Sequence, residues 1–242
     1  MSASVQAVTL TPRGMARLAG VFEVLEGSFS LAGQQLLTGA VVNVHDATAT
    51  ANNILGNETL YRAAVAAGLL AVVWHLLWGF LLYDLFKVID RTVARFSLLL
   101  LVVGSTLQAV TGLLLFGPLV LLRADALDAF TQQQREALSL VFLRLNAQSN
   151  DIFLAFFGCW LIAIGYLVYR SRLMPGFIGA SLAIEGLGWV TYVSPPVGAA
   201  LFPIIAVFGI FGELFFAGWL LIKGVDNERW RAAALREQRD HG

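Results

Sequence analysis

Long apolar runs separated by short polar segments divide the sequence, and six of the runs are long enough to cross a bilayer as helices. A transmembrane helix needs about 20 predominantly apolar residues. The pattern predicts spans at about residues 16–42, 63–86, 96–121, 151–170, 175–194 and 200–222. We therefore expect an all-α fold, a polytopic membrane protein built as a bundle of six transmembrane helices.

The polar segments between and after the runs carry helical patterns of their own. "HDATATANNILGNETLYR" is long enough for a short helix on the membrane surface, and the stretch from Gln132 is expected to continue into the fourth span or to lie in the interface. "DNERWRAAALREQRDHG" predicts a charged, solvated C-terminal helix. The predicted organisation is a polar segment at 1–15, a transmembrane domain at 16–223 and a cytoplasmic helix at 224–242.

Composition agrees with a membrane protein. The chain is 58% hydrophobic and 13% charged, whereas soluble domains are typically about 25% charged. Lys plus Arg equals Asp plus Glu, so the chain lacks the basic footprint of a nucleic-acid-binding protein. Cys159 is the single cysteine, which excludes an intramolecular disulfide and CxxC-type metal motifs. Residues 1–12 have no basic region before a short apolar core, so no cleavable signal peptide is expected.

The distribution of Lys and Arg predicts the orientation, because positively charged flanks stay in the cytoplasm. With six spans and both termini inside, the outer segments hold Arg62, Arg123 and Arg135, and Arg144 is ambiguous. The remaining basic residues fall inside: Arg13, Arg17, Lys87, Arg91, Arg95, Arg170, Arg172, Lys223, Arg229, Arg231, Arg236 and Arg239. We therefore expect both termini to be cytoplasmic and the protein to lie in a bacterial inner membrane, surrounded by membrane lipid.

Five ionisable residues interrupt the apolar runs at one depth. With a rise of ~1.5 Å per residue from the inner ends, Glu23 lies roughly 10 Å into the membrane, and Glu26, His75, Glu185 and Glu213 lie roughly 14–16 Å in. Glu23 and Glu26 are three residues apart and share a helix face. The four predicted helices that carry these residues can therefore bring them into one intramembrane chamber.

The energetic cost of charge in a bilayer decides where these side chains point. An unpaired charge at the bilayer centre costs ~2.5–3.5 kcal/mol, so four glutamates facing lipid would cost on the order of 10 kcal/mol. His75 is the single nearby base and can neutralise one carboxylate at most. Burial and mutual repulsion both favour the neutral form of an acid. We expect the glutamates to face inward, and some of them to be neutral near pH 7.

Neighbouring polar and aromatic residues extend the candidate site. Gln108 comes slightly deeper than the acids, Trp78 follows His75 by three residues, and Trp189 follows Glu185 by four. Tyr192 lies in the same helix as Trp189. Aromatic walls around an acid suit an apolar ligand or a developing cation, although helix packing explains single rings and Gln108 equally well. The predicted assignment gives a catalytic role to Glu213, Glu185 and His75. It gives a binding role to Glu23, Glu26, Gln108, Trp78, Trp189 and Tyr192.

Three stretches of the sequence resemble one catalogued family. In the first linker, the resemblance rests on Asp46, Thr50, Ala51, Asn53, Ile54, Glu58, Leu60, Tyr61 and Arg62. Around the fourth span it rests on Asp151, Gly158, Gly165, Tyr166, Ser171, Pro175 and Gly179, and in the last span on Gly212, Glu213, Trp219 and Gly224. These motifs are similar to those of the bacterial membrane family catalogued as domain of unknown function 4386. The resemblance implies a multi-pass membrane protein and no established activity. Glu213 is the mid-membrane acid that maps to the pattern, whereas Glu23, Glu26, His75 and Glu185 depart from it.

Three functions fit these observations. The first is binding of, or action on, a lipophilic small molecule, with a buried neutral Glu as proton donor or polar anchor. The second is proton- or cation-coupled transport through the same carboxylates. The third is an accessory or structural subunit, whose partner is another membrane protein or a second copy of the chain. The sequence contains no GxSxG, HExxH or P-loop motif. It also lacks the Glu-x-x-His pairs of helix-bundle metal sites, so no metal is assigned and the cofactor is left open.

Overall fold

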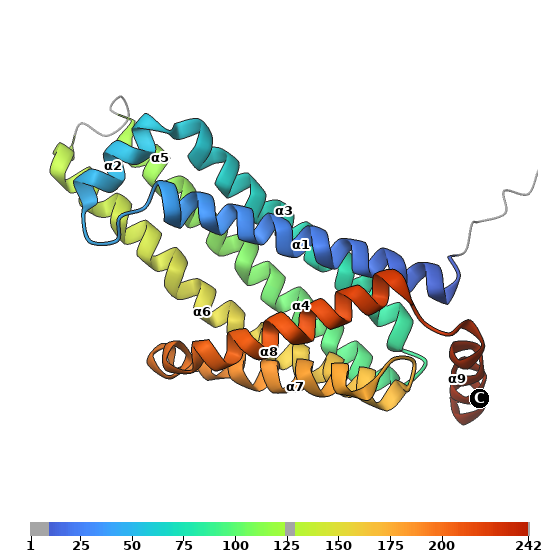
Figure 1. Cartoon of the computed structure of the whole chain (residues 1–242). Coiled ribbons are helices and arrows are strands. Elements are labelled where there is room, and N and C mark those ends of the chain that lie inside the picture. Colours follow the sequence, from blue (N-terminus) through green and yellow to red (C-terminus); the bar gives the residue numbers. More distant parts are fainter. Residues whose placement is uncertain (1–9, 124–128, 242) are drawn as a thin grey trace, which may run out of the picture.

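Each predicted span is helical in the computed structural model, which describes residues 10–123 and 129–241, with 37–40 and 240–241 described as backbone only. These residues form helices, and no strand occurs among them. The helices in chain order (Figure 1) are α1 (Pro12–Ala40), α2 (Ala47–Gly56), α3 (Glu58–Phe86), α4 (Arg91–Gly112), η1 (Leu113–Phe116), α5 (Gly117–Leu122), α6 (Gln132–Ser171), α7 (Gly176–Val190), η3 (Thr191–Val193), α8 (Pro195–Ile222) and α9 (Asn227–His241).

Five helical segments in the described part of the chain are long and apolar enough to cross a membrane. They are Glu58–Phe86, Arg91–Leu122, Gln132–Ser171, Gly176–Val193 and Pro195–Ile222. The all-α class and the multi-pass membrane architecture are thereby confirmed. The helix α1 is not among the five, because its acids and glutamines lower its hydropathy. It nevertheless packs along α3 and also contacts α8. The sixth span and the orientation of the termini stay predictions.

The helices α6 and α7 make a close contact that depends on paired glycines. A Cβ atom on Gly158 would lie 2.5 Å from the carbonyl oxygen of Gly186, and one on Gly165 would lie 2.6 Å from the carbonyl oxygen of Gly179. Small residues let helix backbones approach in a membrane, where van der Waals contact drives association. The two pairs therefore hold α7 directly against α6.

The first linker forms the cap at the end of the bundle that carries α2. Asp46 begins α2 and accepts a hydrogen bond from the backbone N–H of Ala49. Thr50 Oγ1 donates to the carbonyl oxygen of Asn43 and accepts from its N–H. Glu58 pairs with Arg62 at 2.8 Å and with Arg123 at 2.6 Å. Several of the linker residues that carry the family resemblance therefore make contacts that stabilise this cap.

The third predicted span is interrupted near the same end. The α-helix α4 ends at Gly112, the 3₁₀ turn η1 follows, and α5 begins at Gly117 with Pro118 in its first turn. Tyr61 Oη donates to the carbonyl oxygen of Leu115, and Asn146 Nδ2 donates to that of Thr111. Proline lacks an N–H group, and the first turn of a helix needs none there. The two side chains add hydrogen bonds to carbonyl groups at the break.

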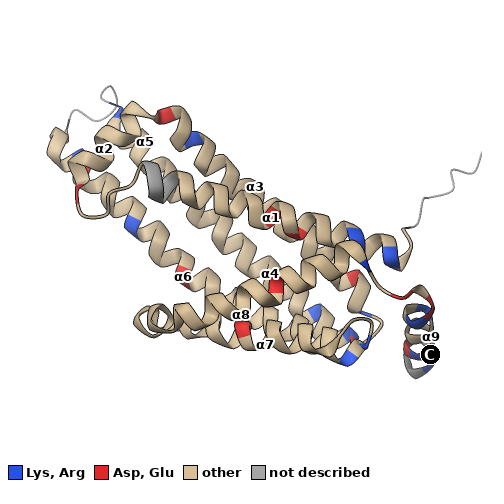
Figure 2. Cartoon of the chain, in the orientation of Figure 1, with Lys and Arg blue, Asp and Glu red and all other residues tan. Residues whose placement is uncertain are grey.

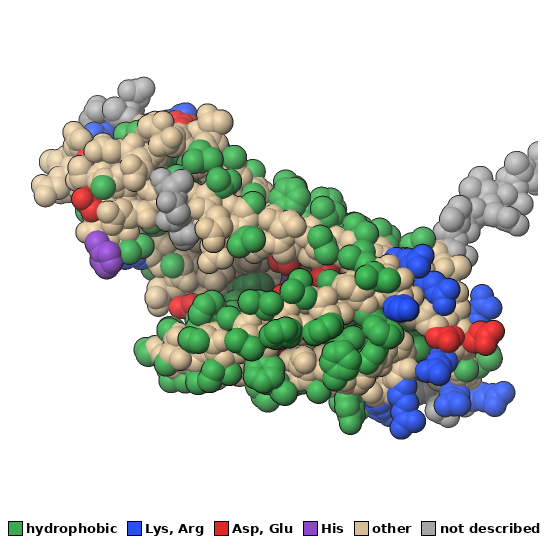
Figure 3. Space-filling model, viewed as in Figure 1, with side chains coloured by type: hydrophobic (Ala, Val, Ile, Leu, Met, Phe, Trp, Pro, Cys, Tyr) green, Lys and Arg blue, Asp and Glu red, His purple; other side chains and the backbone are tan. Residues whose placement is uncertain are grey.

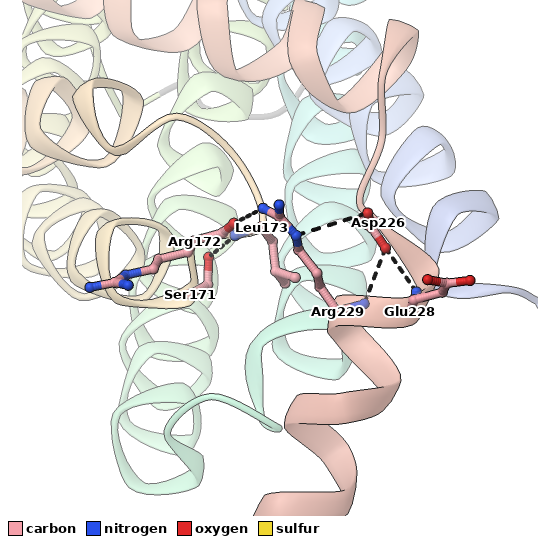
Figure 4. A network of polar contacts seen from close by, with 6 residues as sticks. All are labelled: Ser171, Arg172, Leu173, Asp226, Glu228 and Arg229. Atoms are coloured by element: carbon pink, nitrogen blue, oxygen red, sulfur yellow. Dashed lines mark hydrogen bonds and ion pairs between the residues drawn. The ribbon is translucent and has the colours of Figure 1, made fainter.

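At the opposite end of the bundle the start of α1 meets the end of α8 and the helix α9, and Lys and Arg side chains gather there (Figure 2). We call it the basic end. Gly224, with φ +64°, packs against Arg13, whose N–H donates to Asn227 Oδ1. Figure 4 shows Asp226 accepting from the backbone N–H groups of Glu228 and Arg229, while Arg229 reaches the carbonyl oxygen of Arg172. These contacts attach α9 to the loop between α6 and α7.

Asp226 illustrates the electrostatics of this end. The backbone hydrogen bond from Arg229 is the main cause that holds the pKa of Asp226 below its ordinary value. The N–H of Glu228 and the charges of Arg229 and Arg13 act in the same direction. Because these interactions favour the carboxylate, they stabilise the folded junction between α8 and α9 when Asp226 is ionised.

Candidate functional site

Small residues bring α1 close to its two neighbours on either side of its acids. A Cβ atom on Gly20 would lie 2.9 Å from Leu221 Cγ of α8, and one on Gly33 would lie 3.0 Å from the carbonyl oxygen of Ala64 of α3. Glu23 lies between these contacts and is 7% exposed. Glu26 lies one turn further along, with 23% of its side chain exposed. The acids of α1 are therefore turned toward the bundle interior.

His75 lies in the interior of the bundle among aromatic rings. It is 2% exposed, and its Nδ1 lies 4.0 Å from Glu26 Oε1. Its ring centroid lies 5.6, 6.2, 5.6 and 5.2 Å from the ring centroids of Trp78, Phe153, Phe157 and Trp160. In these apolar surroundings, the carboxyl group of Glu26 is the acid that lies beside the imidazole.

Glu185 extends from α7 to the backbone of α8. It is 1% exposed, and its Oε1 accepts a 2.9 Å hydrogen bond from Trp189 Nε1. A Cβ atom on Gly209 would lie 3.0 Å from Oε1, and one on Gly212 would lie 3.4 Å from Oε2. The two glycines of α8 thus leave the space that the Glu185 carboxyl group occupies. Gly212 directly precedes Glu213 in the sequence.

The four carboxyl groups are electrostatic neighbours. Glu23 is repelled by Glu213, Glu26 and Glu185, and Glu26 is repelled by Glu213. Glu185 is likewise repelled by Glu213. Figure 2 shows acidic positions in the middle parts of α1 and α8. We call the group of Glu23, Glu26, His75, Glu185 and Glu213 the acidic cleft.

The acidic cleft is open on one side of the molecule. Figure 3 shows a hollow between α1 and α8, with acidic side chains at its bottom and hydrophobic side chains along both edges. The helices α1 and α8 touch near the basic end, where Gly20 meets Leu220 and Leu221. The opening faces sideways, toward the volume that lipid tails would fill around the transmembrane helices.

Several buried polar atoms in and beside the cleft lack a hydrogen-bond partner among the described residues. They are both carboxyl oxygens of Glu23, Oε2 of Glu185, and the Nε1 atoms of Trp74 and Trp78. Buried polar groups in proteins are nearly always hydrogen-bonded, so each exception calls for an explanation such as an absent water, ion or ligand. No group of three or more His, Cys, Asp or Glu in the described part of the chain is arranged to hold a metal ion.

The remaining predicted site residues lie at different distances from the acidic cleft. Trp78 and Trp189 contact His75 and Glu185 directly. Tyr192 packs on the ring of Trp189 at 5.7 Å and lies at the rim, near Asp151. In the described residues, no hydrogen bond or ring contact connects Gln108 to the five, although its carbonyl oxygen accepts from Thr111. The binding role of Gln108 stays a prediction.

Sequence reasoning missed the wall that α6 supplies. Phe153, Phe157 and Trp160 lie on one face of α6, and Phe157 stacks on both of the others. Their spacing of four and three residues indicates one helix face. An apolar span offers many such triplets, so the spacing alone does not identify this face. The role of Gly209 and Gly212 beside Glu185 likewise left no signal in the sequence.

Comparisons with known proteins place the chain in a family. The family model described as "Domain of unknown function (DUF4386)" matches residues 18–224. An uncharacterized protein of Archaeoglobus fulgidus is 37% identical over 75 residues, which cover 31% of this chain and 45% of that protein. The chain thus matches less than half the length of this relative. No solved structure matches.

Proposed function

This chain belongs to the DUF4386 family and is a multi-pass membrane protein, and on that premise we propose that its acidic cleft binds a lipophilic small molecule. Neutral glutamic acids serve as proton donors or polar anchors for the head of that molecule. The observation that carries the proposal is the gathering of four carboxyl groups from three helices beside His75, with both oxygens of Glu23 buried and unpartnered.

Protonation of the acids follows from the shortage of positive charge. His75 is the basic side chain within 4.0 Å of one of these acids, Glu26, and one imidazole can neutralise one carboxylate. Two carboxylates as close as those of Glu185 and Glu213 cannot both ionise in a medium of low dielectric. We infer that at least two of the four glutamates are neutral acids at pH 7.

Access from the membrane supports a lipophilic ligand. Hydrophobic side chains lie along both edges of the hollow between α1 and α8 (Figure 3). A water-soluble substrate would have to cross this apolar border, whereas a lipid-soluble one would enter sideways. The rings of Trp78 and Trp160 offer the apolar part of the ligand a buried surface.

The proposal also includes the orientation of the protein and the membrane in which it lies. The concentration of Lys and Arg at the basic end supports a cytoplasmic position for that end, under the rule that positive flanks stay inside. Both α1 and α9 begin there. We propose that the protein lies in the bacterial inner membrane with α2 on the outer side.

Quenching of tryptophan fluorescence tests the binding proposal. The full chain in lipid nanodiscs would be titrated with bromoalkyl alcohols and amines of one chain length, because bromine quenches nearby indoles and several tryptophans line the cleft. We expect saturable quenching with at least one of the probes, and weaker binding of the tightest-binding probe in Glu213→Gln. The control Glu237→Gln changes an acid that pairs with Arg91 at the basic end and should quench like the wild type. Quenching that rises linearly with each probe in all variants would contradict binding in the cleft.

A further inference from the structure

We propose that the ligand of the acidic cleft is a lipophilic amine, whose nitrogen takes a proton from a glutamic acid of the cleft. This inference rests on the proposed function and narrows it to one chemical class. The structure supplies three kinds of observation that favour an amine: the sign of the charges, the unpartnered carboxyl oxygens and the surrounding aromatic rings.

The negative charge of the acidic cleft disfavours anionic ligands. Glu23, Glu26, Glu185 and Glu213 repel one another, and no ion pair in the described residues joins any of them to a Lys or Arg side chain. A ligand with a carboxylate or phosphate head would add to the repulsion. A ligand cation within about 4–6 Å of several carboxyl groups would favour their charged forms and offset their repulsion.

The unpartnered atoms match the hydrogen-bonding capacity of an ammonium group. Among the described residues, both oxygens of Glu23 and Oε2 of Glu185 are buried without a hydrogen-bond partner. These residues lie on α1 and α7, on opposite sides of the cleft, and each is at least nine-tenths buried. A protonated primary amine has three N–H donors and no acceptor, and donors to ionised carboxylates form the stronger class of hydrogen bond.

Aromatic rings lie beside two residues of the acidic cleft, His75 and Glu185. Trp78 and Trp160 lie 4.9 Å apart, edge to face, next to His75, and Trp189 contacts Glu185. The face of an indole attracts an ammonium ion through its quadrupole, most strongly where water is excluded. The same rings would cover the first carbons of the alkyl chain.

Proton transfer in the cleft keeps the total charge unchanged. The amine enters from the lipid as the neutral base. The O–H bond of one glutamic acid breaks and an N–H bond forms, so a neutral pair becomes an ammonium–carboxylate pair at the same place. No isolated charge has to cross the apolar border, and the ion pair forms where further carboxyl groups can accept its hydrogen bonds.

The competing class is a lipophilic carbonyl compound. Its oxygen would accept from a neutral glutamic acid and from the unpartnered Nε1 of Trp78. Such a ligand would leave the oxygens of Glu23 unpartnered, because it brings no donor to them. The two classes therefore differ in whether the ligand donates or accepts at the bottom of the cleft.

The test compares bromoalkyl probes that share one chain and differ only in the head: a primary amine, an alcohol and a methyl ketone. With the full chain in nanodiscs, we expect the amine to reach half-saturation at a concentration about tenfold lower than the alcohol or the ketone. Glu23→Gln and Glu213→Gln should each weaken amine binding by about tenfold, with alcohol binding changed far less. Glu237→Gln should match the wild type with every probe, and circular dichroism with size-exclusion chromatography confirms that the variants fold.

The remaining outcomes separate the two proposals. Equal affinity for amine and alcohol, or tighter binding of the ketone, would overturn the amine assignment and leave the lipophile-binding function standing. Failure of all three probes to saturate would overturn the proposed function as well. A trimethylammonium probe cannot accept a proton, so its binding as tightly as the amine would overturn the proton-transfer step.

Discussion

Trp189 Nε1 donates a 2.9 Å hydrogen bond to Oε1 of Glu185, which precedes it by four residues on α7. The bond orients the carboxyl group toward α8, where Gly209 and Gly212 leave room for it. This arrangement keeps one oxygen of Glu185 engaged and turns the other, which has no partner among the described residues, toward the acidic cleft.

The first prediction concerns this bond. Glu185→Gln keeps an oxygen acceptor for Trp189 and should unfold within about 1 kcal/mol of the wild type, whereas Glu185→Leu leaves the indole N–H unpaired and should cost about 1–3 kcal/mol. Unfolding with increasing SDS in mixed micelles measures the difference. In a Trp189→Phe background, Leu and Gln at position 185 should become nearly equal. A penalty for Leu that persists in that background would show that the bond is not its cause.

The contact between α6 and α7 gives a second prediction. Gly158→Ala places a methyl group 2.5 Å from the carbonyl oxygen of Gly186, and overpacking of this kind typically costs about 1–3 kcal/mol. Gly218→Ala on α8 is the matched control, because nothing lies within 4 Å of its added Cβ. Thermal unfolding in detergent should show a lower midpoint for the first variant and an unchanged or higher one for the second. Equal midpoints would mean that α6 and α7 can move apart at little cost in stability.

Asp226 gives a prediction about pH. Its folded pKa lies below its ordinary value, mainly because the N–H of Arg229 donates to it, so its stabilising contribution is present above the unfolded pKa of about 3.9. The contribution is lost as the pH falls through the lower folded pKa. The difference in thermal midpoint between wild type and Asp226→Asn should therefore be largest near pH 7 and shrink toward pH 3. Glu228→Gln is the control for a neighbouring exposed acid, and a difference that grows on acidification would contradict the assigned sign.

The orientation can be tested by labelling with a membrane-impermeant thiol reagent in intact cells. Cys159 would first be changed to Ser, and single cysteines placed at the exposed positions Asn52 on α2, Thr11 before α1 and Gln238 on α9. We expect Asn52→Cys to react in intact cells, and Thr11→Cys and Gln238→Cys to react only after lysis. Labelling of Thr11→Cys from the outside with Gln238→Cys protected would remove α1 from the set of spans.

More of the fold than of the site could be predicted, because long hydrophobic runs indicate helices directly. The continuation of the fourth span from Gln132, the short helix of the first linker and the C-terminal helix are all confirmed. The interruption at Leu113–Phe116 was less visible, since Pro118 indicates a bend and not a 3₁₀ turn held by Tyr61 and Asn146.

For the site, depth along each helix could be estimated from the sequence, but rotation about the helix axis could not. Glu23, Glu26, Glu185 and Glu213 share a depth and also face one another. Gln108 has a similar estimated depth on α4, which packs against α3 and α6, and its binding role stays a prediction. The rotation of each helix is fixed by close contacts such as those of Gly20 and Gly209. Such contacts depend on which helices become neighbours, and spacing within one helix does not determine that.

The protonation of the four glutamates tests the central claim most directly. Infrared difference spectroscopy of the protein in nanodiscs, with Glu23→Gln, Glu26→Gln, Glu185→Gln and Glu213→Gln to assign the bands, resolves the C=O stretch of neutral carboxyl groups. We predict that at pH 7 at least two of the four glutamates carry a proton, because one imidazole lies beside them and low dielectric penalises every unpaired charge. All four glutamates titrating near the ~4.3 of model peptides would mean an open, water-filled cleft and would contradict the neutral-acid account.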